Sequence, residues 1–208
     1  MRISEMRQTS TERFTLVFDD GSAMKTTLDI VAGMYLYSGM ELDEADFEAL
    51  KNASEYSLCQ GHAARLISQQ AMSKKGLRDK LVQKGETPEN AQQAADRLEE
   101  LGVLDDSVFA GIVVRHYAAK GFGAGRIKNE LYRHGVPREL WDEGLKEMPE
   151  QDEKMDRFIR TRLTDPEDRA QIKKVTDGLA RRGYSWSEIK EALARFKAEA
   201  EETQWTEQ

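Results

Sequence analysis

Cysteine and long apolar runs are nearly absent from this sequence. Cys59 is the one cysteine among 208 residues, so no internal disulfide can form. No apolar stretch approaches the length that spans a bilayer, and no N-terminal segment combines positive charge, an apolar run and a small-residue cleavage site. These absences lead us to expect a cytoplasmic protein.

The sequence also has little of what catalysis or metal binding requires. Cys59 and His62 form an isolated pair that would need two further ligands to hold zinc. The glycine-rich segment 121–125 follows a predicted helix and lacks the Lys-Ser/Thr ending of a phosphate-binding loop, so we interpret it as a flexible cap. Asp105 and Asp106 start a helix, where capping is the expected role of a carboxylate. We therefore predict no enzyme activity, no metal and no cofactor.

Basic residues do not dominate the composition. The chain has 31 Lys and Arg against 38 Asp and Glu, a net charge of -7. This balance excludes a uniformly basic nucleic-acid binder but allows local basic surfaces. With 39% hydrophobic and 33% charged residues, the sequence favours thin helical layers over one thick core.

In residues 1–52 the spacing of apolar residues is typical of strands in some segments and of helices in others. Phe14, Leu16 and Phe18 alternate with Thr15, Val17 and Asp19, which predicts a strand, and Asp19-Asp20-Gly21 supplies a turn. We predict strands at 13–19 and 22–27, a helix at 28–37, a brief strand at 40–42 and a helix capped by Asp43. This segment is therefore predicted to be a small α+β module with a β-hairpin.

From residue 53 onward the apolar residues have helical spacing, and one three-helix pattern occurs three times. The second helix of each copy ends at a glycine, and aliphatic residues stand four and eight positions before it. These sets are Leu77, Leu81 and Gly85; Ile127, Leu131 and Gly135; and Val175, Leu179 and Gly183. Such spacing marks one face of a helix, and glycine is the residue best able to take the left-handed conformation that ends it.

The predicted fold is mainly α: an elongated, curved tandem array of three three-helix repeats that follows the N-terminal module. Short linkers between the copies favour stacking of successive repeats. The predicted boundaries are 1–52 for the N-terminal module, 53–102 for repeat 1, 103–149 for repeat 2, and 150–208 for repeat 3 with a polar tail.

The junction between repeats 1 and 2 has a distinctive layout. One helix ends at Gly102, Asp105 or Asp106 caps the next, and Phe109 is expected to pack the two repeats against each other. The residues predicted to build the array are Leu81, Gly85, Asp105, Asp106, Phe109, Leu131, Gly135, Leu179 and Gly183.

The second helices of the three repeats are basic. They carry net charges of +4, +2 and +4, whereas the third helices of repeats 1 and 2 are acidic. If the repeats stack in register, these basic helices form a stripe suited to an extended polyanion, either DNA or an acidic groove on a protein filament. The alternative is that each is a solvated face whose cations are favoured by the helix dipole.

Three motifs, taken together and in order along the chain, form a pattern that is specific for one protein family. They are the second helix of repeat 1 from Ser73 to Gly85, the junction from Leu98 to Ala110, and the segment from Gly121 to Val136. In this order they resemble the RecX family, bacterial regulators of the RecA recombinase. The similarity runs from Ser54 to Met148 and is weaker in repeat 3, and the N-terminal hairpin resembles an extension seen in some members. Val103 departs from the pattern, in which an aromatic residue commonly follows the glycine.

The resemblance implies a helical-repeat protein that binds the RecA–DNA filament and inhibits strand exchange, ATP hydrolysis and coprotease activity. It would thereby modulate DNA repair, recombination and the SOS response, without chemistry of its own. We expect a monomer whose contacts with DNA lie within the filament or are weak and nonspecific. The alternative is a direct helix-turn-helix-like DNA-binding protein with the hairpin as a wing, which the overall acidity argues against.

The candidate filament contacts are cations of the basic helices and of the helix that precedes the second of them. They are Lys74, Lys75, Arg78, Lys80, Lys84, Arg115, Lys120, Arg126, Arg133, Lys173, Lys174, Arg181 and Arg182.

Overall fold

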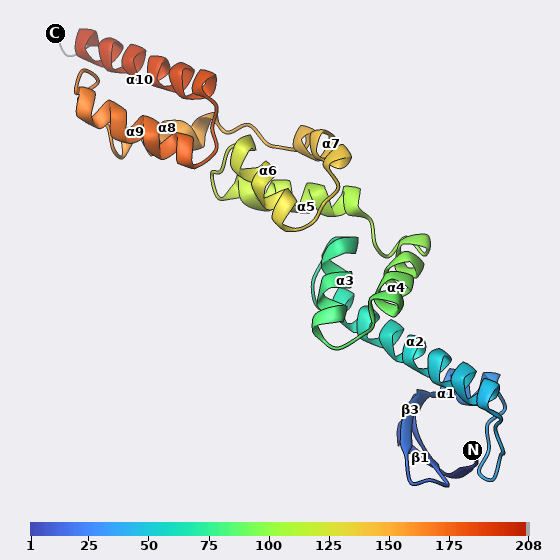
Figure 1. Ribbon diagram of the computed structural model, residues 1–208. Helices are drawn as coiled ribbons and strands as arrows, with labels where there is room; N and C mark the ends of the chain where they lie inside the picture. The colour runs from blue at the N-terminus through green and yellow to red at the C-terminus, as the bar shows by residue number, and fades with distance from the viewer. Residues whose placement is uncertain (207–208) are drawn as a thin grey trace. The chain divides into compact units, whose positions relative to one another are not determined.

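The structure is a computed structural model that describes the backbone of residues 1–206 and the side chains of residues 1–201. It divides into two compact units, Met1–Leu104 and Asp105–Gln208, which are described here one at a time. The fold is mainly helical with a small N-terminal sheet, which confirms the predicted fold class (Figure 1). No helix in the described part of the chain has the length and apolar character to cross a membrane.

The N-terminal sheet has three antiparallel strands in chain order, β1 (Ile3–Ser10), β2 (Arg13–Phe18) and β3 (Ala23–Thr27). Both predicted strands are present as β2 and β3, but the sequence did not reveal β1. Only Ile3 is buried along this edge strand, so it has no alternating apolar face and pairs through its backbone. The sheet buries Leu16 and Phe18 against Leu50.

Two short predicted elements are smaller than expected. The helix predicted over 28–37 ends early, as α1 (Leu28–Gly33). The strand predicted over 40–42 is a single bridge between Glu41 and Arg2. Leu36 and Leu42 nevertheless enter the core of the N-terminal module, so burial of these side chains holds the connecting segments in place.

A single long helix, α2 (Glu44–Gln69), replaces the two helices predicted on either side of residue 53. Asp43 caps it as predicted, accepting a hydrogen bond from the Asp46 N–H at 2.7 Å. No proline or glycine interrupts the chain from residue 44 to residue 60, so nothing in that stretch ends the helix. The same helix therefore contributes to the N-terminal module and to repeat 1.

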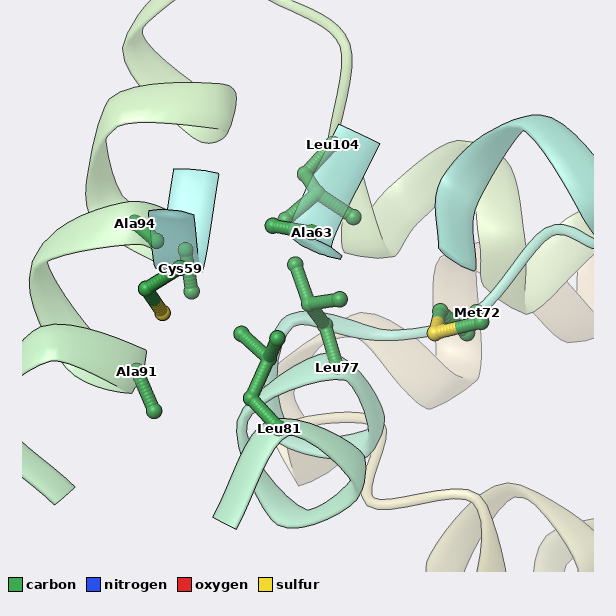
Figure 2. Packing of buried hydrophobic residues seen from close by; sticks show 9 residues of the cluster. Cys59, Ala63, Met72, Leu77, Leu81, Ala91, Ala94 and Leu104 are labelled. Atoms are coloured by element: carbon green, nitrogen blue, oxygen red, sulfur yellow. The ribbon is translucent and has the colours of Figure 1, made fainter. Parts of the chain in front are cut away.

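Repeat 1 is completed by α3 (Lys74–Gln83) and α4 (Pro88–Glu100), with Ser73 and Thr87 as N-caps. Figure 2 shows its core, in which Leu77 and Leu81 of α3 face Cys59 and Ala63 of α2. Small alanines on α4 complete this core and let the helices approach closely; they are Ala91, Ala94 and Ala95. This packing closes the first compact unit.

Repeat 2 contains α5 (Asp106–Ala119), α6 (Ala124–Arg133), the 3-10 turn η1 (Arg138–Leu140) and α7 (Trp141–Lys146). Asp105 is the N-cap of α5, accepting from the backbone N–H groups of Ser107 at 2.8 Å and Val108 at 3.1 Å. Phe109 packs inside repeat 2 beside the His134 ring, and its expected role between repeats 1 and 2 stays a prediction.

Repeat 3 contains α8 (Asp152–Arg160), α9 (Arg169–Arg181) and α10 (Trp186–Thr206). Its core includes Met155 and Ile159 of α8, Val175 and Leu179 of α9, and Ile189 of α10. The last two residues of the predicted polar tail lie outside the described residues.

The second helix of each repeat ends in the same way. Gly85, Gly135 and Gly183 have φ values of 96°, 74° and 89°, in the left-handed region. The residue after each glycine donates its N–H to the carbonyl of the buried Leu81, Leu131 or Leu179, which satisfies an orphan carbonyl at the helix end. This is the geometry that the recurring sequence pattern predicts.

Glycines join repeat 2 to repeat 3 at a contact that we call the glycine seam, formed by Gly123, Gly125, Arg182 and Gly183. The N–H groups of Gly123 and Gly125, at the start of α6, donate at 2.9 Å to the carbonyls of Arg182 and Gly183 at the end of α9. Segment 121–125 lies between α5 and α6 and caps α6 at Gly123, as predicted, and it also docks against the end of α9. Each helix end satisfies the orphan backbone groups of the other.

Candidate partner-binding surface

The predicted cations of α3 differ in how far they are neutralised. Lys74 is 24% exposed and pairs with Asp96 and Glu99 of α4, each at 2.6 Å. These two hydrogen bonds raise the pKa of Lys74 above its usual value. The charge of Lys74 is thus largely used to hold α3 against α4.

The remaining α3 cations are more available. Lys75 pairs with Asp79 on its own helix at 2.8 Å, and Arg78 donates to the Gln92 side chain at 2.5 Å. Neither Lys80 nor the exposed Lys84 forms an ion pair with a side chain that the structure describes. These two lysines keep an unneutralised charge.

Carboxylates neutralise much of the predicted set in repeat 2. Arg126 and Arg133 both reach Glu130, at 2.8 and 3.5 Å, and this glutamate side chain is only 5% exposed. Arg115 of α5 pairs with Glu147. Lys120 is exposed, and its ammonium lies 5.3 Å from the centre of the Tyr117 ring. The charge of α6 is therefore mostly satisfied inside the repeat.

The cations of α9 are the least neutralised. Lys173, Lys174 and Arg181 are exposed and form no ion pair with any described residue. Arg182 is different: its backbone is part of the glycine seam, and its half-buried side chain donates to the Gly121 carbonyl at 3.3 Å. The candidate contacts thus fall into neutralised, unneutralised and seam-bound groups, a sorting that net helix charge does not reveal.

Repeat 3 supplies cations that the sequence pattern did not single out. A cavity of about 630 Å³ beside the glycine seam is lined by Lys154, Arg157 and Arg162 in addition to Lys120 and Arg182. The first two lie on α8, whose acidic residues conceal them in any count of net charge, and Arg162 follows that helix. A signal that separated the two faces of α8 could have found Lys154 and Arg157.

Comparison with protein families identifies repeat 2. Residues 105–145, which span α5 to α7, match the model of the RecX second three-helix domain. A regulatory protein RecX from Xanthomonas axonopodis pv. citri is 37% identical over 140 residues, covering 66% of this chain and 86% of the relative. A second, from Clostridium tetani, is 24% identical over 199 residues and covers 92% of each chain.

Solved structures share the fold. A crystal structure of regulatory protein RecX covers 91% of this chain and 97% of its own, with a TM-score of 0.71 at 23% sequence identity. RecX from Lactobacillus salivarius covers 70% of this chain and 99% of its own, with a TM-score of 0.63 at 20% identity. The helical repeats, the matched second domain and the identity over most of a relative's length lead to one conclusion: this chain belongs to the RecX family of regulatory proteins.

Proposed function

We propose that this protein binds the RecA–DNA filament in the cytoplasm and inhibits its recombinase, ATPase and coprotease activities. Membership of the RecX family carries the proposal, because the resemblance names RecA as the regulated partner. Regulation here means binding alone, because the relatives of this chain are regulatory proteins and not enzymes.

The unneutralised cations of α9 support a contact with a polyanionic partner. Lys173 and Lys174 are neighbours on an exposed part of α9, and neither forms an ion pair with a described carboxylate, although Asp168 at the start of the helix interacts with Lys174 electrostatically. An exposed lysine can approach phosphate or carboxylate groups without first breaking an internal ion pair. We therefore place the filament contact on α9 ahead of α6, whose arginines are held by Glu130.

The test is RecA ATPase activity on single-stranded DNA, measured while the purified chain is titrated in. The double variant Lys173→Glu/Lys174→Glu should raise the half-inhibitory concentration at least about tenfold, because two attractive contacts become repulsive. The control Lys25→Glu/Lys190→Glu makes the same charge change at exposed positions outside the α9 face and should stay within about twofold of the unaltered chain. Absence of inhibition by the unaltered chain would refute the proposed function, and equal loss in both variants would refute the α9 surface.

Direct binding to bare DNA is the second candidate, and its support is the same set of exposed cations. A titration of duplex DNA without RecA, at several salt concentrations, distinguishes the two proposals. We expect weak binding that disappears as salt rises, because the whole chain carries a charge of -7. Tight, sequence-selective duplex binding would favour the second candidate.

A further inference from the structure

The cavity beside the glycine seam has an unusual concentration of positive charge. Five cations line it, Lys120, Lys154, Arg157, Arg162 and Arg182, and no carboxylate is among its described lining residues. Lys120 follows α5 in repeat 2, whereas the other four belong to repeat 3. The cavity thus collects like charges from two repeats, an arrangement that is unfavourable unless an anion neutralises it.

Backbone carbonyls of repeat 2 hold two of these cations without neutralising them. Lys154 donates to the Ala118 carbonyl at 2.6 Å and Arg182 to the Gly121 carbonyl at 3.3 Å, both near the end of α5. An ammonium has three donors and a guanidinium has five, so each keeps further N–H groups for a ligand. These contacts fix the positions of the cations and leave their charge available.

An aromatic ring orders two of the guanidinium groups. The Arg162 and Arg182 groups lie 3.9 and 4.9 Å from the centre of the Phe158 ring. With these cations against it, the Phe158 ring is not a free platform on which a nucleobase could stack. The site is therefore built to recognise negative charge rather than a base.

We infer that this cavity binds linked phosphate groups, supplied either by a nucleic-acid backbone or by a free oligophosphate. Guanidinium and ammonium groups are the usual protein partners of phosphate oxygens, and several of them together suit an anion with more than one negative charge. A volume of about 630 Å³ exceeds what a single small ion needs and lies within the range of small-ligand sites. The inference does not depend on RecA and stands if the chain fails to inhibit the filament.

The first experiment titrates sodium tripolyphosphate into the full-length chain by calorimetry at constant ionic strength. We expect one binding site and a higher thermal unfolding midpoint in its presence, because the ligand is held by both repeats. The variant Lys120→Gln/Arg157→Gln should weaken binding at least about tenfold. Both side chains are exposed and form no ion pair with a described residue, so circular dichroism should show an unchanged fold.

The matched control is Lys173→Gln/Lys174→Gln, which removes two charges from the same unit outside the cavity. It should bind tripolyphosphate within about twofold of the unaltered chain, since distant surface charges are screened. Equal weakening in both variants, or no binding by the unaltered chain to either tripolyphosphate or an oligonucleotide, would overturn the inference.

A parallel titration with oligo-deoxythymidylate distinguishes the two sources of phosphate. Binding that the Lys120→Gln/Arg157→Gln variant loses assigns the site to a nucleic-acid backbone. Binding of tripolyphosphate alone assigns it to a free oligophosphate. Oligonucleotide binding that both variants weaken equally, without tripolyphosphate binding, places the contact elsewhere and overturns the inference. RecA inhibition is measured separately, so failure of the proposed function and failure of this site give different results.

Discussion

Gly183 has two constraints that few glycines in the chain share. Its φ of 89° lies in the left-handed region, and a Cβ at this position would collide with the backbone nitrogen and Cα of Arg126. Gly123 is constrained from the other side, because its added Cβ would lie 2.6 Å from the Gly183 carbonyl carbon. The close approach of the start of α6 and the end of α9 therefore requires glycine on both sides of the contact.

This double constraint predicts a large effect for Gly183→Ala. Gly85→Ala is the matched control, since Gly85 has a φ of 96° but open space around its added Cβ. We expect the control to lose about 1 to 2 kcal/mol of unfolding free energy from backbone strain alone. Gly183→Ala should lose a further ~1 to 3 kcal/mol from the collision, as measured by urea denaturation. Equal losses would show that the glycine seam does not contribute to stability.

Cys59 should be chemically inert in the folded protein. Burial, followed by the nearby Glu86 carboxylate, raises the pKa of its thiol to about 12, and the side chain is fully buried in the core of repeat 1. Because the thiolate is the reactive form, iodoacetamide should label the native chain far more slowly than the chain in concentrated guanidinium chloride. Similar labelling rates in the two conditions would show that the core of repeat 1 opens readily.

At the scale of the helix, acid should weaken α9 through its N-cap. Asp168 accepts hydrogen bonds from the N–H groups of Gln171 and Ala170, which lower its pKa below the usual 3.8. This contribution to stability is complete above the unfolded pKa and is lost as the pH falls through the lower folded value.

Asp168→Asn isolates this contribution, because asparagine keeps a capping oxygen without a charge that titrates. The stability advantage of the unaltered chain over Asp168→Asn should shrink as the pH falls to 3.8 and below, in urea titrations at a series of pH values. An advantage that does not change with pH would show that the carboxylate charge has no role in the cap.

The helix ends were the features that the sequence predicted best. Capping depends on residues a few positions apart, so the roles of Asp43, Asp105 and Gly85 could be predicted locally. Strand β1 could not be predicted, because an exposed edge strand shows no apolar alternation. The glycine seam depends on residues some sixty positions apart, such as Gly123 and Gly183, and no local pattern reports such a contact.

Only part of the candidate contact surface could be predicted from the sequence, for a similar reason. Net charge identifies α3, α6 and α9 as basic, but whether each cation is neutralised depends on acidic residues of other helices, such as Asp96 and Glu99 for Lys74. The seam cavity combines cations from α8 with residues that follow α5 and α9. Its composition is a property of tertiary packing.

For the whole molecule, the contrast between a net charge of -7 and exposed α9 cations predicts a particular salt dependence. If Lys173 and Lys174 contact phosphates, filament binding should weaken with salt along a line in log–log coordinates. The variant Lys173→Gln/Lys174→Gln should then have a slope shallower by about 0.7 to 0.9 for each phosphate that it no longer neutralises. Fluorescence anisotropy of labelled filaments can measure it, and identical slopes would argue that these lysines bind protein rather than DNA.

Helix α2 fixes the rotation of the N-terminal core relative to the core of repeat 1. Leu50 belongs to the core of the N-terminal module, whereas Cys59 and Ala63 belong to the core of repeat 1, and one uninterrupted helix carries all three. Each residue advances an α-helix by about 100°, so one alanine inserted after Glu55 would turn one set of buried side chains away from its core. Seven inserted residues complete nearly two turns and should restore most of the thermal stability that a single insertion removes. The distance between the two cores can therefore change only in steps of whole helical turns.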